Sequence, residues 1–249
     1  LGWNIPQHTV VPMASGSLLT KIQKSYQEFT KLGLVSEAKY SIHGAQATDN
    51  VVAGCYIGTT ANGGTMDPNP CGISISTLAS NNRIGSSNGS VRTLVSGNLL
   101  AGIRVTGNAA NNQILNCIVG TDVTGARSLP NGLGGIVIDR GAHHNRIGGD
   151  TIATRNLISG NQAAGIIVRG SETIANSVAG NMIGLDATGT LPLGNKGPGI
   201  LIHDYANKTI IGDTALFPGN VISGNAGDGI RIFGTGADST VVLGNFIGV

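Results

Sequence analysis

The stretch that decides the fold is residues 165–186, which reads GIIVRGSETIANSVAGNMIGLD. It contains three short runs in which apolar and other residues alternate, beginning at Ile166, Ser177 and Met182. Alternation over a few positions is the period of a β-strand. The glycines and asparagines between the runs suit tight corners, because both adopt left-handed backbone conformations readily. One such unit is therefore expected to form three short strands separated by turns.

The phrase that opens this stretch, Gly-Ile-x-(Ile/Val), occurs six times at spacings of 30–34 residues, beginning at Gly72, Gly102, Gly135, Gly165, Gly199 and Gly229. A repeat of this length indicates a solenoid, in which neighbouring coils cover each other's apolar edges. The spacings alternate because extra residues enter at two different places. One kind of coil is longer before its third strand, at 85–93, 148–155 and 212–219. The other is longer after it, at 58–70, 120–134 and 184–198.

Asparagines recur at corresponding corners of the coils, which predicts two columns of stacked amides. One column comprises Asn50, Asn82, Asn112, Asn145, Asn176 and Asn207, followed by Thr240. The other comprises Asn156, Asn181, Asn220 and Asn245, preceded by Cys55, Thr93 and Cys117. Stacked Asn side chains hydrogen-bond along the axis of a strand array. The alternative, that Asn merely marks turns, explains its abundance but neither register.

The segments GNMIGLDATGTLPLGN, NLISGN and GIIV resemble the repeats of right-handed parallel β-helices of the pectate-lyase-like superfamily. Such repeats are typical of large repetitive bacterial secreted and cell-surface proteins. The resemblance covers about residues 49–249 and implies an all-β, right-handed parallel β-helix of three-strand coils. It also implies a secreted or cell-surface location in a bacterium. It does not select a function, because this fold serves lyases, hydrolases, adhesins and structural stalks.

Residues 1–48 differ in character from the repeats and form a separate predicted unit, an N-terminal arm with one helix. Leu18, Ile22, Tyr26 and Phe29 lie on one face of a helix over about residues 18–32. An amphipathic helix needs an apolar surface to cover, and the resemblance implies that it caps the open end of the β-helix. The predicted division is therefore 1–48 and 49–249.

Composition and motifs exclude several functions. The chain has 249 residues and a net charge of only +2, which argues against nucleic acid as a partner. No apolar run approaches the ~18–20 residues of a membrane span. A phosphate-binding loop, a nucleophile elbow, an HExxH motif and zinc-type Cys/His spacing are all missing from the sequence. We therefore expect no cofactor.

The best catalytic candidates are Asp139, Arg169 and His203, which follow the Gly-Ile-x-Ile phrase on adjacent coils and should share one outer face. The resemblance implies a catalytic role for such residues, because lyases of this fold combine calcium-binding carboxylates with a basic residue on such a face. One carboxylate is too few for calcium, which takes six to eight oxygens, or for the carboxyl pair of a glycosidase. A surface ion pair is the favoured interpretation.

Two further sets of residues are candidate sites. Asp122 and Asp186, in the phrases TDVTG and LDATG, are the candidate metal ligands, although a single Asp in each long loop favours a loop-organising turn. Val137, Ile167 and Leu201 occupy the x position of three successive repeats and should be exposed side by side. A contiguous apolar stripe usually marks a covered surface. We therefore expect it to contact another chain or the N-terminal arm, the alternative being ordinary exposed strand.

The cysteines leave two alternatives open. Cys55 and Cys71 flank the first long loop and could form a disulfide across it. Alternatively, Cys55 and Cys117 are small buried thiols that replace Asn in the second column.

The function expected from the sequence is structural: a rigid extracellular β-helix rod that forms part of a surface fibre, a stalk or a head-to-tail filament. Its partners would be neighbouring copies of the chain. The runner-up is binding or cleavage of a polysaccharide on the face from Val137 to His203. Scarce aromatic residues, 4% of the chain, favour the rod, because sugars stack on aromatic rings.

Overall fold

A computed structural model describes residues 42–213 and 219–249 of the chain. Almost all regular structure in this part is β-strand, arranged as three parallel sheets of seven strands each. The exception is one short 3-10 helix, η1 (Ile152–Thr154). The predicted N-terminal helix lies outside the described residues.

The strands of the three sheets follow one another in strict rotation along the chain. The first sheet comprises β1 (Ile42–Ala45), β4 (Ile73–Ser76), β7 (Ala101–Val105), β10 (Gly134–Asp139), β13 (Ala164–Arg169), β16 (Ile200–His203) and β19 (Ile230–Phe233). The second comprises β2 (Val51–Val52), β5 (Arg83–Ile84), β8 (Gln113–Ile114), β11 (Arg146–Ile147), β14 (Ser177–Val178), β17 (Ile210–Gly212) and β20 (Val241–Leu243). The third comprises β3 (Tyr56–Ile57), β6 (Thr93–Val95), β9 (Cys117–Val119), β12 (Leu157–Ile158), β15 (Met182–Ile183), β18 (Val221–Ile222) and β21 (Phe246–Ile247).

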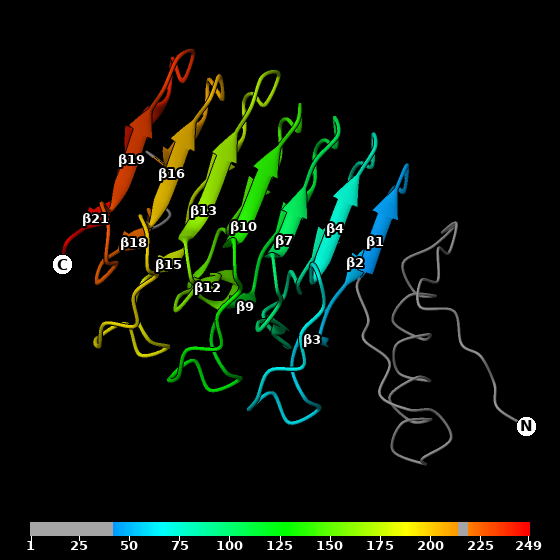
Figure 1. Ribbon diagram of the computed structural model, residues 1–249, viewed down its shortest axis with the longest axis vertical. Coiled ribbons are helices and arrows are strands. Elements are labelled where there is room, and N and C mark those ends of the chain that lie inside the picture. Colours follow the sequence, from blue (N-terminus) through cyan, green and yellow to red (C-terminus); the bar gives the residue numbers. More distant parts are fainter. Residues whose placement is uncertain (1–41, 214–218) are drawn as a thin grey trace, which may run out of the picture.

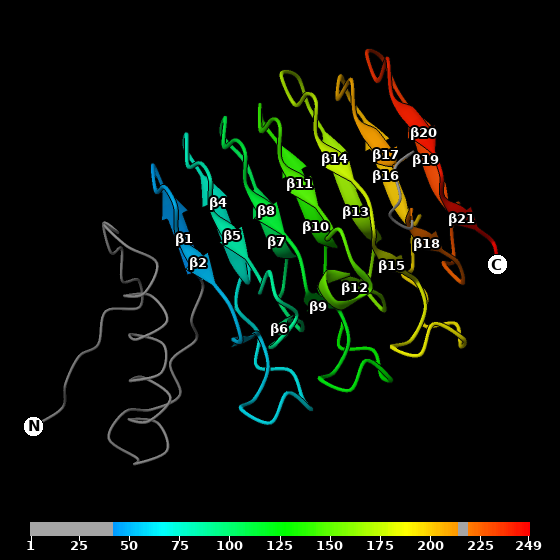
Figure 2. The same cartoon turned by 180° about the vertical axis from the view of Figure 1, so that it is seen from behind.

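One strand from each sheet makes a coil, and the coils stack as coils 1 to 7 in chain order (Figure 1). The expected all-β parallel solenoid of three-strand coils is therefore confirmed. Coil 1 begins at Ile42, before the expected start of the repeats at residue 49. Its first strand reads Ile-His-Gly-Ala and pairs with β4 although it lacks the Gly-Ile-x-Ile phrase. The same stack seen from behind shows the strands of the second sheet in front (Figure 2).

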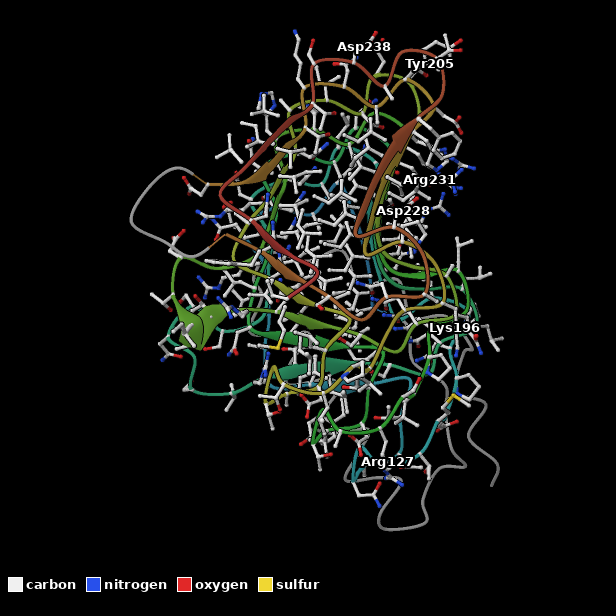
Figure 3. The ribbon with its side chains drawn as sticks, turned by 90° about the vertical axis from the view of Figure 1, so that its left-hand side faces the viewer. Arg127, Lys196, Tyr205, Asp228, Arg231 and Asp238 are labelled. Atoms are coloured by element: carbon white, nitrogen blue, oxygen red, sulfur yellow. The ribbon has the colours of Figure 1, made fainter. Side chains whose placement is uncertain are left out.

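The core runs along the axis and is made of Ile and Val from alternate strand positions. Ile136 and Ile138 of β10 are fully buried, as are Ile166 and Val168 of β13 directly above them in register. Figure 3 shows side chains filling the space between the sheets. Each inward residue thus packs on its equivalents in the coils on either side, so burial requires the stack rather than a single coil.

The glycine that opens each Gly-Ile-x-Ile phrase has a packing reason. A Cβ built on Gly135 would lie 2.7 Å from the carbonyl oxygen of Gly165, and one on Gly165 would lie 2.8 Å from that of Gly199. Gly72, Gly102 and Gly199 meet the next coil in the same way. A side chain at this column would push neighbouring coils apart.

Asparagine ladders run along the corners, with Nδ2 of each residue donating to Oδ1 of the next. The first ladder links Asn50, Asn82, Asn112, Asn145 and Asn176 at 2.9–3.1 Å. The second links Asn156, Asn181, Asn220 and Asn245 at 2.8–2.9 Å. Backbone amides of the ladder residues donate to the same oxygens, for example Asn145 N to Asn176 Oδ1 at 3.0 Å. Most of these buried amides are thus satisfied within the stack, the exception in the two ladders being Oδ1 of Asn50, which has no hydrogen-bond partner among the described residues.

The placement of Asn207 in the first ladder was wrong. Ser177 pairs with Ile210, so the residue of coil 6 that stands above Asn176 is Thr209. Asn207 lies two positions earlier, where it forms a bridge with Ile174. In coils 1 to 6 this corner has a buried small residue three positions before the ladder residue, and in coil 6 that residue is Ala206, which agrees with Thr209 as the ladder position.

A third ladder, which the sequence analysis missed, occupies the corner between the third and first sheets. Its bonds of 2.8–3.2 Å link Asn69, Asn98, Asn131, Asn161, Asn195 and Asn225. The signal was present, since Ser-Gly-Asn recurs at 96–98, 159–161 and 223–225. The register of the ladder was hard to see because every second asparagine lies near the end of a long loop. These residues are Asn69, Asn131 and Asn195.

Long loops stack on their own kind two coils away. We call 58–70, 120–134 and 184–198 the flaps; they protrude on the same side of the stack (Figure 1). Val123 N donates to Gly63 O at 3.1 Å and Ala187 N to Gly125 O at 3.0 Å, which joins the three flaps in a row. The corner inserts also meet, because Arg92 Nη2 donates to Arg155 O at 2.9 Å. The two-coil repeat of the sequence therefore corresponds to contacts between loops of the same kind two coils apart.

Removing one asparagine of the third ladder tests how much the ladder contributes to the free energy of unfolding. Asn161→Ala leaves the amide of Asn131 without its acceptor and opens a small cavity. We expect a loss of about 2–4 kcal/mol in unfolding free energy, measured by denaturant titration. Gln162→Ala, an exposed neighbour, is the matched control and should change stability by less than about 0.5 kcal/mol. Equal effects of the two substitutions would contradict the role of the ladder.

Extending the first ladder tests its corrected register. Thr209 is fully buried and its Oγ1 has no hydrogen-bond partner. Thr209→Asn would place an acceptor above Asn176, and we expect a gain of about 1 kcal/mol in unfolding free energy. Asn207→Thr is the control and should have little effect. Destabilisation by Asn207→Thr comparable to that of Asn145→Thr would restore the original register.

Candidate functional site

The outer face of the first sheet carries the predicted site residues, and the structure places them in register. Val137, Ile167 and Leu201 pair across β10, β13 and β16, and Asp139, Arg169 and His203 form the next outward row. The face therefore brings together residues from coils 4, 5 and 6, as the sequence predicted.

The apolar stripe is not exposed as expected. Val137 is 0% and Ile167 5% exposed, and Leu201 is half-buried. They form a small outer cluster with Ala101 and Ala164, which open β7 and β13, and with the half-buried Leu133. The expectation of exposure was wrong because the chain's own corner residues cover the stripe. The predicted contact of Val137, Ile167 and Leu201 with another chain or with the N-terminal arm stays a prediction, since most of that arm lies outside the described residues.

Asp139 is the centre of a buried ion cluster. Arg104 of coil 3 donates to it through Nε at 3.2 Å and through Nη2 at 2.7 Å, a bidentate pair. Arg169 of coil 5 adds a longer contact of 3.5 Å from Nη2. The side chain of Asp139 is only 4% exposed. The interpretation as an ion pair fits this geometry, but the expected surface position was wrong, because the carboxylate is buried. Arg104 is a partner that the sequence analysis left out.

His203 belongs to a separate arrangement at the same face. Its Nδ1 lies 2.8 Å from Oδ2 of Asp204, and its ring stacks on Phe233 with centroids 5.2 Å apart and planes 7° from parallel. The guanidinium carbon of Arg231 lies 4.9 Å from the centroid of the Phe233 ring. The three residues make a stacked platform whose member Phe233 is 44% exposed. In Figure 3 Arg231 lies on the outer side of this face, near Asp228.

The predicted triad is thus divided between two arrangements. Asp139 is engaged by two arginines, whereas His203 is engaged by Asp204 and Phe233. A general base must reach a substrate proton with a lone pair that is not already committed. Asp139 does not meet that condition, because both of its oxygens accept from arginine. In His203 it is Nδ1 that faces Asp204, an arrangement that orients the ring and leaves Nε2 as the nitrogen able to accept a proton.

The flap aspartates organise their own loops. Oδ1 of Asp122 accepts from Thr124 Oγ1 at 2.7 Å and from the amides of Ala126 and Arg127 at 3.1 and 3.3 Å. Asp186 accepts in the same way from Thr188 Oγ1 at 2.7 Å and from two later amides at 3.2 Å. Groups of three or more His, Cys, Asp or Glu able to hold a metal ion are absent from residues 42–213 and 219–249.

These hydrogen bonds lower the pKa of both carboxyls. Burial alone would raise the pKa of Asp122, but donation from Thr124, Arg127 and the Ala126 amide outweighs it. For Asp186 the bond from Thr188 is the largest cause of the lowered pKa. Each carboxyl therefore stays ionised in the folded flap to lower pH than in an unfolded chain.

The cysteines follow the second alternative from the sequence. Cys117 is fully buried in the second ladder, where its backbone amide donates to Asn156 Oδ1 at 2.9 Å, and burial raises the pKa of its thiol to about 12. Cys55 is also buried in that column, two coils below. The thiols of Cys55 and Cys71 are directed at the carbonyls of Ala53 and Ile73, at 3.5 and 3.4 Å.

Comparison with protein-family models, with curated proteins and with solved structures found no match in any of the three. The described residues include no helix with the length and apolar character needed to cross a bilayer.

Low pH should weaken the hydrogen bonds that hold the flaps, because the carboxyls of Asp122 and Asp186 become protonated. A lowered folded pKa means that the stabilisation is fully present above the unfolded value of about 3.9 and is lost as the pH falls through the folded value. We expect the hydrogen-exchange protection of the Ala126 and Thr190 amides to fall together over that range. Asp122→Asn should abolish the pH dependence at Ala126 and leave it at Thr190. Protection that is unchanged down to about pH 2 would contradict this assignment.

Proposed function

We propose that this protein is a non-enzymatic structural rod of an extracellular fibre, stalk or filament. The observation that carries the proposal is continuity. Three parallel sheets pass through all seven described coils, and asparagine ladders along the three corners link coils 1 to 5, coils 4 to 7 and coils 1 to 6. Bending the stack would strain the sheets and, between any two neighbouring coils, at least one ladder.

The stack extends along one axis. Strands in a sheet lie about 4.8 Å apart, so the seven described coils occupy about 30 Å along that axis. The flaps stand out at every second coil and are organised by their own hydrogen bonds. Such flaps would display contact surfaces at a fixed spacing along the rod.

The proposal also covers the location of the protein, the superfamily to which it belongs and its partners. A secreted or cell-surface place in a bacterium, and membership of the pectate-lyase-like superfamily, rest on the resemblance of the repeats. Neighbouring copies of the chain are the proposed partners in the fibre. The committed ion cluster around Asp139 supports a structural role over a catalytic one.

Polysaccharide binding is the second candidate, favoured by one observation. The exposed ring of Phe233, backed by His203 and beside Arg231, is a platform on which a sugar ring could stack. Cleavage would additionally need a group that accepts or donates a proton at that place, for which Nε2 of His203 is the candidate.

One pair of measurements separates the candidates. Negative-stain electron microscopy over a range of concentrations should show rigid rods or fibres, and affinity electrophoresis in gels containing polysaccharides should show no retardation. Retardation that is lost in Phe233→Ala but retained in Phe246→Ala, a matched exposed ring on the third sheet, would support the sugar-binding candidate. Flexible or irregular particles at every concentration would overturn the rod.

A further inference from the structure

Asparagine followed by glycine occurs three times in the chain, at 62–63, 88–89 and 131–132. Such a pair can react with itself, because the glycine nitrogen can attack the side-chain amide carbon of the asparagine and glycine has no Cβ to hinder the approach. The reaction needs a backbone amide that can lose its proton. It also needs donors that stabilise the side-chain oxygen as negative charge develops on it.

The structure restrains two of the three pairs. The amide of Gly63 donates to Thr60 O at 2.8 Å, and that of Gly132 donates to Asn98 O at 3.0 Å. Asn131 is in addition fully buried, and its side chain belongs to the third ladder. Loss of the amide proton would therefore break a hydrogen bond at either place, and in the ladder the attack would also displace a buried amide.

The pair at 88–89 is not restrained in this way. It lies in the insert at 85–93 of coil 2, where Asn88 is exposed and Gly89 half-buried. Among the described residues no group accepts a hydrogen bond from the amide of Gly89. Water and hydroxide therefore reach Asn88, and the glycine nitrogen can lose its proton without breaking a hydrogen bond within the described part of the chain.

Three donors converge on the side-chain oxygen of Asn88. Its Oδ1 accepts from the amide of Ser90 at 3.1 Å, from Ser90 Oγ at 2.6 Å and from Ser86 Oγ at 2.5 Å. Donors on a carbonyl oxygen stabilise the negative charge that develops there when a nucleophile adds to the carbon. Asn62 Oδ1 also accepts two hydrogen bonds, so the unbonded amide of Gly89 is the feature that distinguishes the pair.

Packing between two inserts requires the glycine at position 89. Gly89 has a φ of +71°, and an added Cβ would lie 2.9 Å from both the Cβ and the carbonyl oxygen of Ala153, in the insert of coil 4. Only glycine combines this backbone conformation with so close an approach. The contact between the inserts therefore imposes the residue that leaves the preceding asparagine open to attack.

We propose that Asn88 is a site of spontaneous covalent modification, at which attack by the Gly89 nitrogen converts the asparagine to a succinimide. The Gly89 amide gives its proton to hydroxide, its nitrogen forms a bond to Cγ of Asn88, and the resulting oxyanion is held by Ser86 and Ser90. The bond between Cγ and Nδ2 then breaks, and Nδ2 takes up a proton from water and leaves as ammonia. The step needs no other reactant, and it is independent of the proposed rod.

One water molecule then opens the succinimide in one of two ways. Cleavage of the new bond gives aspartate, whose carboxylate can keep the three hydrogen bonds, as the carboxylate of Asp122 does in its flap. Cleavage of the original peptide bond gives isoaspartate, which adds one carbon atom to the backbone before Gly89. That extra atom displaces Gly89 from Ala153, so this product weakens the contact between the inserts of coils 2 and 4.

Incubation of the folded protein at mildly alkaline pH, followed by peptide mass spectrometry, compares the three pairs in one sample. The same chain unfolded in urea gives the intrinsic rate of each pair. We expect folding to slow deamidation at Asn62 and Asn131 by about ten-fold or more, and Asn88 to react at least as fast as in the unfolded chain. A folded rate at Asn88 below its unfolded rate would overturn the inference.

Substitution of the serines tests their role as donors. Ser86→Ala combined with Ser90→Ala should slow the reaction of Asn88 by about two- to ten-fold, the equivalent of one hydrogen bond. Ser87→Ala, at an exposed serine whose side chain makes no hydrogen bond among the described residues, is the matched control and should leave the rate unchanged. Circular dichroism checks folding, and Ser90→Ala alone, at an exposed position, replaces the double variant if that does not fold. An unchanged or faster rate without the serine hydroxyls would also overturn the inference, because the serines would then restrain Asn88 instead of activating it.

Discussion

Every coil of this protein must approach the next to within one strand spacing, about 4.8 Å, and the remaining architecture follows from that constraint. At such a distance the corners would bury polar groups without water. Asparagine solves the problem, because its amide carries both a donor and an acceptor and can bond to an identical neighbour above and below. Where a backbone carbonyl faces the coil below, as that of Gly165 faces Gly135, only glycine leaves enough room.

The same constraint makes the outer surface depend on neighbours. Asp139 is held by arginines from the coils on either side, and the Phe233 platform joins coils 6 and 7. Charged residues on this face therefore stabilise the stack, because they join neighbouring coils. Removal of Arg104 would leave the buried carboxylate of Asp139 with only the longer contact from Arg169, which costs stability because a buried charge needs close partners. This supports the preference for a structural over a catalytic role.

The two-coil alternation determines which loops meet. Flaps and inserts occupy different corners, so each set has the depth of two coils in which to pack. Loops of one kind therefore contact each other across the intervening coil, as Val123 with Gly63 and Ala187 with Gly125 show. Where a Ser-Gly-Asn corner follows, its serine carbonyl lies over the glycine that comes after the third strand of the coil below, where φ is positive and a Cβ would clash.

The sequence alone determined the three-strand coil, the 30–34-residue period, the parallel stack and the register of most of two ladders. Each of these follows from a short pattern, the Gly-Ile-x-(Ile/Val) phrase or a corner asparagine, that recurs from coil to coil. It also placed Asp139, Arg169 and His203 on one face. Tertiary structure decided the rest. Thr209 rather than Asn207 completes the first column because register is fixed by strand pairing, not by residue type. The burial of Val137 and Ile167 depends on how corners fold against neighbouring coils, which no local pattern of residues shows. Half of the third ladder is visible as the repeated Ser-Gly-Asn, but only the structure shows which asparagines of the long flaps stack on it, because those lie at a different distance from their strands.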